Sequence, residues 1–391
     1  MLIAPKHDTP APLSAVESPP LEVLHTGPDM NGRGGIPAVI RTLIASPLAS
    51  GHRFSFLPTY GSSSPGKRLL IFARGMLDLA AWCRRPGERL VHIHAATRGS
   101  WYRKAVATAL VKALSRPVLL HFHAGAGDIR DFEQRLGPIR LGLIRWAFLQ
   151  ADEVIAVSAA SAAEVQRIIG FDAVAVVPNA APTIADDATG RPAEASPPAI
   201  VYLGGFANPA KGSEVLIEAL PSVLAADPDV RILLAGPGEP TAAAEVLLRS
   251  PRVRWEGYLN ADEKALALQE AQLFVMPSIS EGMPVALLEA MAYGLAVVAT
   301  RVGGIPEVAT DGFDARLVEA GHSTVLALTL IELLADPDRR RELGRAARQR
   351  AERLNDNEVF SPLEEIYGAI GAPGLLRPSF EPAPALAREA A

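Results

Sequence analysis

Two glutamates, Glu281 and Glu289, stand in a run from residue 276 to 304 whose pattern predicts a strand end, a turn and a helix. Pro284 opens the expected helix, because a residue without an amide proton is favoured in a first helical turn, and Gly294 closes it. Glu281 then lies in the turn and Glu289 in the helix, beside amides of residues 283–286 that attract anions. Carboxylates accept paired hydrogen bonds from vicinal hydroxyls, so the run predicts a sugar-nucleotide site with a diphosphate at the helix end.

The text around this pair carries a resemblance to a known family. The motif begins with GluGlyMetPro at 281–284 and ends with LeuLeuGluAlaMetAla at 287–292. GlyGlyIleProGlu follows at 303–307. The chain from Leu21 to about Ile370 resembles retaining GT-B glycosyltransferases of family 4, of the group 1 type, and is similar to bacterial exopolysaccharide glycosyltransferases. The resemblance implies that Glu289 binds the ribose and that Glu281 contacts the donor sugar. The other donor-binding residues it implies in this run are Gly282, Met283, Pro284 and Val285.

Two further segments fit the same family. TyrLeuGlyGlyPheAlaAsnProAlaLysGly at 202–212 resembles the opening of the donor domain, with Lys211 matching the lysine that reaches the diphosphate. A fixed cation stabilises the charge that grows on a departing phosphate. Gly205, also a donor-binding candidate, stands where many relatives carry arginine, so either another basic residue replaces that charge or one cation suffices. At residues 31–37, Gly34 and Gly35 permit close backbone approach to a ligand, and the family places them at the diphosphate.

Histidines recur at alternate positions in two expected strands, as His92 and His94 and as His121 and His123. Alternate residues share one face of a strand, which opens a metal-binding alternative, but no matching carboxylate spacing accompanies them. The resemblance places one histidine at the donor sugar, and we favour His123 over His121. It implies catalysis by His123, Glu281 and Lys211 through front-face attack. We expect no metal or other cofactor, because Lys211 and the helix amides stabilise the leaving group.

The acceptor side is expected in the first half of the chain. Residues 96–105 resemble an acceptor-side stretch of exopolysaccharide glycosyltransferases, and residues 140–150 form an apolar and basic helix that suits either a membrane interface or an ordinary core-facing position. Between residues 67 and 145 there are 15 basic and 5 acidic residues, which indicates an anionic partner or a solvated basic face. We expect a glycan or polyprenyl-diphosphate-linked acceptor, an anionic membrane surface and no nucleic acid. The candidate residues are Arg98, Trp101, Arg103, Lys104, Arg140 and Arg145.

Short apolar runs alternate with helical patterns along the chain, which predicts α/β architecture with parallel sheets buried on both faces. Strands are expected at 21–25, 90–94, 118–123, 153–158, 173–178, 199–204, 230–236, 253–258, 273–277 and 295–300. Ligands bind at the carboxyl ends of such strands, so two doubly wound domains facing a cleft would position the site.

The expected segments are a flexible N-terminus at 1–20, a Rossmann-like acceptor domain at 21–185 and a linker at 186–198. A nucleotide-sugar domain follows at 199–355. The resemblance implies that a crossover helix at 356–371 then packs on the first domain, and a flexible tail is expected at 372–391.

The chain has 391 residues and a single cysteine, Cys83, which excludes an internal disulfide. No apolar run approaches the about 20 residues that span a bilayer, and the first residues lack a secretion-signal pattern. We therefore expect a cytoplasmic protein, with a peripheral place on the inner face of the membrane as an option. A nucleotide-sugar epimerase of similar architecture and a non-catalytic nucleotide-sugar-binding module remain alternatives. Neither the donor base, UDP or GDP, nor the sugar and the acceptor follow from the sequence.

Overall fold

The computed structural model describes residues 20–371 apart from 31, 33, 62–63, 172 and 186–196. The expected flexible ends at 1–19 and 372–391, and residues 186–196 of the expected linker, lie outside the described residues. The domain boundaries themselves stay predictions.

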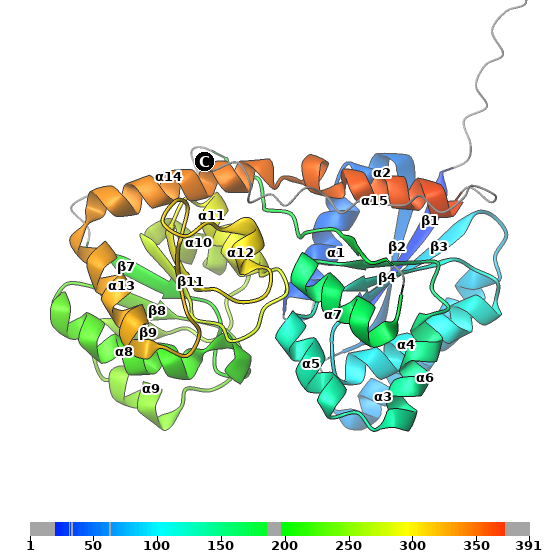
Figure 1. The fold of residues 1–391 in the computed structure, drawn as a ribbon, viewed down its shortest axis with the longest axis horizontal. Coiled ribbons are helices and arrows are strands. Elements are labelled where there is room, and N and C mark those ends of the chain that lie inside the picture. Colours follow the sequence, from blue (N-terminus) through cyan, green and yellow to red (C-terminus); the bar gives the residue numbers. More distant parts are fainter. Residues whose placement is uncertain are drawn as a thin grey trace, which may run out of the picture.

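Two parallel six-stranded sheets form the described chain, and Figure 1 shows them in two lobes side by side. The first has the order β2-β1-β3-β4-β5-β6. Its strands are β1 (Leu21–Pro28), β2 (His52–Tyr60), β3 (Arg89–Ala95), β4 (Val118–Phe122), β5 (Glu153–Ala156) and β6 (Ala175–Val176). The helices between them are α1 (Gly35–Ala45), α2 (Leu48–Gly51), α3 (Pro65–Cys83), α4 (Gly99–Ala113), α5 (Ala126–Gln134), α6 (Pro138–Phe148) and α7 (Ala159–Ile169).

The second sheet has the order β12-β11-β10-β7-β8-β9. Its strands are β7 (Ala199–Tyr202), β8 (Arg231–Leu234), β9 (Val253–Trp255), β10 (Leu273–Met276), β11 (Ala296–Thr300) and β12 (Arg316–Val318). A 3₁₀ turn at Pro209–Lys211 precedes its helices, which are α8 (Ser213–Ala226), α9 (Ala242–Leu247), α10 (Ala261–Glu270), α11 (Val285–Ala292), α12 (Ile305–Val308) and α13 (Ser323–Ala335). The expected two-sheet α/β fold is confirmed, with β2 and β12 as strands that the sequence did not predict.

The two lobes are tied together by a shared apolar core and by the last two helices. One cluster of buried side chains contains residues from both sheets, such as Leu119 and Phe274, together with Leu287 of α11. In Figure 1, α14 (Pro337–Arg353) runs along the second lobe and α15 (Asp356–Gly371) continues over the first. Tyr367 of α15 is fully buried against the first sheet, so the end of the described chain returns to the lobe in which the chain begins.

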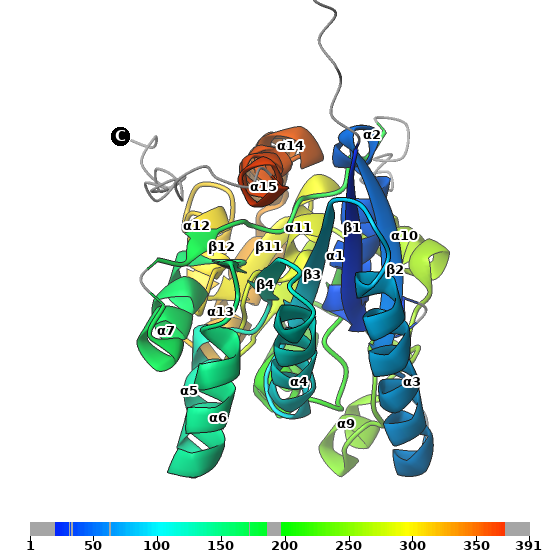
Figure 2. The same cartoon turned by 90° about the vertical axis from the view of Figure 1, so that its right-hand side faces the viewer.

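Three helices, α3, α4 and α6, pack beside one another on the opposite face of the first sheet, as Figure 2 shows. They cover a second buried cluster that includes Cys83 and Trp101. Burial raises the pKa of the Cys83 thiol to about 11, so the thiol is protonated near pH 7. Among the described residues, no helix is long and apolar enough to cross a bilayer.

Candidate functional site

A cavity of about 570 Å³ lies where the carboxyl ends of the two sheets face each other. This volume falls within the range of about 300–1,000 Å³ that is typical of small-molecule sites. The first lobe contributes residues that follow β1 and β4, and the second contributes residues that follow β7 and β10. Of the predicted donor-site residues, the cavity wall includes Gly34, Gly35, His123, Lys211, Glu281, Gly282, Met283, Pro284, Val285 and Glu289.

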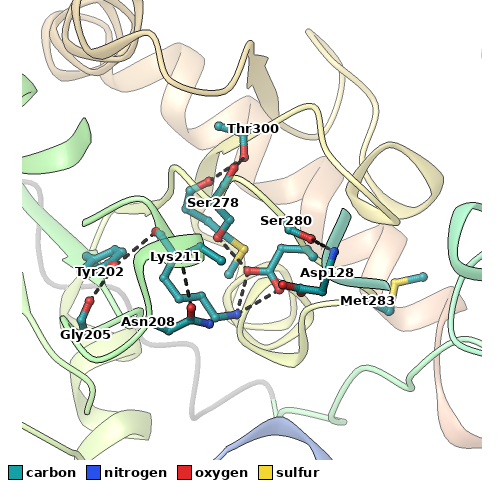
Figure 3. A network of polar contacts seen from close by, with 12 residues as sticks. Asp128, Tyr202, Gly205, Asn208, Lys211, Ser278, Ser280, Met283 and Thr300 are labelled. Atoms are coloured by element: carbon teal, nitrogen blue, oxygen red, sulfur yellow. Dashed lines mark hydrogen bonds and ion pairs between the residues drawn. The ribbon is translucent and has the colours of Figure 1, made fainter. Parts of the chain in front are cut away.

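Glu281 lies in the turn between β10 and α11, as predicted, and its carboxylate is held by two partners. Lys211 Nζ lies 2.8 Å from Oε1 and 3.0 Å from Oε2, and the Ser278 hydroxyl donates to Oε1 at 2.7 Å. Lys211 lies in the 3₁₀ turn that follows β7, and Figure 3 shows its side chain near Ser278. Lys211 therefore pairs with an acid of the same cavity instead of capping α8, and the pair presents a cation and an anion side by side.

The turn at Glu281 is fixed by a glycine beneath it. Gly303 has a φ of +54°, in the left-handed region, and a Cβ at this position would overlap the carbonyl oxygen of Glu281. The GlyGlyIleProGlu segment thus has a steric reason to follow the acidic turn. Pro284 precedes α11 in extended conformation rather than opening its first turn, and the helix begins at Val285.

Glu289 lies on α11 and forms an ion pair with Lys264 of α10. Burial and the Glu289 carboxylate raise the pKa of the neighbouring Tyr293. Lys264 could not be identified from sequence, because its contact with Glu289 depends on how α10 packs beside α11. Among the described residues that line the cavity, Lys211 and Lys264 are the lysines, and no arginine is included.

Gly205 does not line the cavity with the other predicted donor residues. Its φ is +65°, and a Cβ on it would overlap the backbone of Pro237. An arginine at this position would require a different path for the loop. Donor binding by Gly205 stays a prediction, and Lys264 is a second lysine at the cavity wall.

His123 lines the cavity, whereas His121 is buried below it and does not. The structure thus favours His123 for the position left open between the two. Burial, with a smaller contribution from the charge of Lys104, lowers the pKa of His123 to about 3. The ring is neutral at neutral pH and can act as a hydrogen-bond donor or acceptor.

Asp128 and Asn179 are further polar residues of the cavity that the sequence did not predict. Asp128, in the first turn of α5, donates its backbone N–H to the Ser280 hydroxyl across the cavity at 3.2 Å (Figure 3). Burial raises the pKa of its carboxyl, and the nearby Glu281 raises it further. Asn179 donates to the carbonyl oxygen of Met283 at 2.7 Å and so ties the two lobes at the site. Asp128 comes three residues after the HisPheHisAlaGly segment at 121–125. This closeness to His123 was the sequence signal that could have identified it.

Two of the predicted acceptor-side residues, Trp101 and Lys104, are buried. Trp101 is fully buried among Phe122, Phe132 and Phe148, so it is a core residue. Lys104 is also buried, with its ammonium donating to the Thr59 hydroxyl at 2.7 Å and to the carbonyl oxygen of Thr26 at 3.2 Å. Neither can contact an acceptor at the surface, because both point from α4 into the first lobe.

The remaining four acceptor candidates reach the surface to different degrees. Arg98 is exposed beside the cavity residue Thr97, and its charge acts to lower the pKa of Asp128. Arg103 is half-buried over the Tyr60 ring, 4.5 Å from the ring centroid. Arg140 and Arg145 are exposed on α6, away from the residues that line the cavity.

Two family models match this chain. The model for family 4 glycosyltransferases matches residues 33–183, and the model for group 1 glycosyl transferases matches residues 197–336. A phosphatidyl-myo-inositol mannosyltransferase of Mycobacterium leprae is 32% identical over 45% of this chain and 47% of its own length. An alpha-maltose-1-phosphate synthase of Mycolicibacterium smegmatis is 34% identical over 58% of this chain and 66% of its own. The matched part therefore spans about half the length of the mannosyltransferase relatives.

Solved structures show the same fold at lower identity. Sucrose-phosphate synthase of Thermosynechococcus elongatus superposes with a TM-score of 0.71 at 20% identity, covering 89% of this chain and 98% of the other. HepE of Anabaena, in complex with UDP and glucose, superposes with a TM-score of 0.66 at 17% identity, covering 89% and 99%. Because family models match both lobes and the structure has the two-sheet fold, the chain belongs to the group 1, family 4 glycosyltransferases of GT-B fold.

Proposed function

We propose that this protein is a retaining glycosyltransferase that moves a sugar from a UDP- or GDP-linked donor to a hydroxyl of a glycan or lipid-linked acceptor. The carrying observation is the cavity at the strand ends, where Lys211 pairs with Glu281 and Lys264 with Glu289. The Glu289 end suits a ribose, and the Glu281 end suits the donor sugar. Lys211, paired with Glu281, suits the diphosphate.

The proposed reaction needs stabilisation of a leaving group more than a strong base. The bond from the anomeric carbon to the diphosphate oxygen breaks while the acceptor hydroxyl attacks from the same face. The hydroxyl proton passes to the departing diphosphate oxygen, so the balance requires no further reactant. Lys211 stabilises the charge that develops on the diphosphate, together with the amides at the start of α11. On this proposal the reaction proceeds without a metal or other cofactor.

The donor is proposed from the chemistry of relatives. One mannosyltransferase of Corynebacterium glutamicum is named as GDP-mannose-dependent and is 36% identical over 37% of this chain. HepE is described with UDP. Both point to a nucleoside diphosphate sugar, and the base is left as the variable that a donor panel resolves.

The acceptor is proposed to be lipid-linked because the first lobe carries an apolar and basic surface. On α6, Ile139, Leu143 and Trp146 are 78%, 64% and 58% exposed, with Arg140 and Arg145 beside them. The helix α3 adds the exposed Leu69, Leu70 and Leu77. Both α3 and α6 pack against α4. Such a surface suits an anionic membrane, which supports a cytoplasmic, peripheral location and a role in exopolysaccharide or cell-surface polysaccharide synthesis.

The test is transfer from a panel of UDP- and GDP-sugars to a membrane lipid extract, followed by mass spectrometry and by NMR of the new anomeric centre. We expect one base to dominate, retained configuration, and the same rate with a chelator present. Lys211→Met should lower the rate at least about a hundredfold, since it removes a charge that acts on the transition state. The matched control is Lys112→Met, which removes a lysine of α4 that is paired with Asp152. Absence of transfer from every donor, or inverted product, would contradict the proposal.

A further inference from the structure

Five histidines gather on one face of the first sheet: His25 of β1, His92 and His94 of β3, and His121 and His123, in β4 and just after it. The strand register places His25 opposite His92, and His94 opposite His121. The first four are buried, and His123 alone of the five lines the cavity. Burial is also the largest cause of a lowered pKa in each of them, so all five are neutral near pH 7.

The rings form two hydrogen-bonded rows. In the first row, His123 Nε2 lies 2.9 Å from His94 Nδ1, and His94 Nε2 lies 3.1 Å from His25 Nδ1. In the second row, the Tyr367 hydroxyl lies 2.7 Å from His92 Nδ1, and His92 Nε2 lies 3.2 Å from His121 Nδ1. The ring centroids within the first row are 5.1 and 5.4 Å apart, which is the separation of rings joined edge to edge.

The rows are stacked face to face, with 4.2 Å between the centroids of His92 and His94 and 4.0 Å between those of His121 and His123. A ring nitrogen directs its lone pair within the ring plane. Stacked rings at interplanar angles of 18° and 33° therefore do not aim their lone pairs at one point. This arrangement favours mutual hydrogen bonding over a shared metal ion, although three-histidine groups lie close enough to suggest one.

The first row restricts where its protons can be. A neutral imidazole has one donor nitrogen and one acceptor nitrogen. His94 is bonded at both nitrogens, so it donates at one and accepts at the other. The row then has only two arrangements: the unpaired N–H lies either on His123 Nδ1 or on His25 Nε2. Both of these atoms are buried, and neither has a hydrogen-bond partner among the described residues.

The two ends of the row differ in what can reach them. His25 is fully buried, with its ring against Phe54, whereas His123 lines the cavity that a substrate would enter. A buried N–H without an acceptor is costly and rare, so the unpaired proton belongs at the end where an acceptor can arrive. We propose that His94 is a positioning residue that holds His123 in the tautomer with its proton on Nδ1, available to donate to a substrate oxygen.

The test reads the tautomer directly, by ¹⁵N NMR of histidine-labelled protein, with the His123 signal assigned from its loss in His123→Gln. We expect a protonated Nδ1 and an unprotonated Nε2. His94→Phe keeps an aromatic ring but removes the donor to Nε2, so protonated Nε2 should appear. His25→Phe should leave His123 Nδ1 protonated, because the other arrangement would put an unpaired N–H on the buried Nε2 of His94. His94→Leu serves if His94→Phe does not fold. The matched control is His92→Phe, equally buried on the same strand but in the other row.

The consequence for turnover rests on the proposed transferase function, but the tautomer does not. His94→Phe should lower kcat about tenfold, about the contribution of one hydrogen bond, with the donor KM within about twofold. His92→Phe should keep kcat within about twofold. If the tautomer changes but no sugar is transferred by any variant, the transferase proposal fails and the positioning role stands. An unchanged His123 tautomer in the His94 variants, equal effects of His92→Phe and His94→Phe, or stoichiometric metal bound to the histidines would overturn the inference.

Discussion

Lys104 should make the stability of this protein depend on pH in a direction that can be worked out. Its ammonium is buried between β1 and β2, where it donates to Thr59 and Thr26, and burial lowers its pKa from 10.5 to about 7. The charge of the adjacent Arg103 lowers it further. In the unfolded chain the lysine regains its ordinary pKa, so between about pH 7 and 10.5 the unfolded state binds more protons than the folded state.

The free energy of unfolding therefore rises with pH across that window. Below about pH 7 both states are protonated, and the cost of the buried charge is fully present and constant. Two pH units above the folded pKa, at about 1.36 kcal/mol per unit, give roughly 2.7 kcal/mol between pH 6 and pH 9. Because other groups also titrate, the quantity to measure is the difference in unfolding free energy between wild type and Lys104→Met.

Urea unfolding at pH 6, 7, 8 and 9, followed by tryptophan fluorescence, measures this difference. Three of the four tryptophans, at 82, 101 and 146, lie in the first half of the chain, so the signal reports mainly on the lobe that holds Lys104. Lys112→Met on the same helix controls for the loss of one positive charge at a part-exposed position. A wild-type minus Lys104→Met difference that stays constant within about 0.5 kcal/mol, or that grows toward low pH, would refute the reasoning.

Three further predictions concern the site and its surroundings. Glu289→Ala should weaken nucleoside diphosphate binding about tenfold or more by calorimetry, because it removes a charged hydrogen-bond acceptor, while Glu281→Gln should mainly lower turnover; unchanged affinity in Glu289→Ala would contradict this. The Glu307 carboxylate accepts from the N–H of Ala159 at 2.8 Å and of Ala160 at 3.1 Å, at the start of α7 in the other lobe. Glu307→Gln should therefore raise the radius of gyration in X-ray scattering as the lobes separate more often, and an unchanged scattering profile would argue against this latch. Trp146→Ser should reduce co-sedimentation with anionic vesicles several-fold, whereas Leu266→Ser, an exposed apolar residue of the second lobe, should not; equal binding by all three proteins would exclude α6 as a membrane contact.

Local patterns were sufficient for most strands and for the acidic turn. Buried parallel strands are short continuous apolar runs, so β3, β4, β10 and β11 were predicted close to their observed bounds. β2 was missed because it is an edge strand with alternating exposure that contains Pro58, and β12, at the edge of the second sheet, was missed as well. Glu281 and Glu289 could be placed in a turn and a helix because these signals are local, whereas Lys211 was assigned through the family resemblance.

What the tertiary structure decided is which side chains meet and which are exposed. The basic and aromatic stretch at 98–104 predicted a surface, but α4 turns Trp101 and Lys104 into the lobe, and helix orientation on a sheet is not a local property. The Lys264–Glu289 pair needs α10 beside α11, and the histidine rows need the register of three strands from distant parts of the chain. Sequence spacing fixes the face on which a residue lies, whereas contact across elements depends on packing and register, which only the folded chain determines.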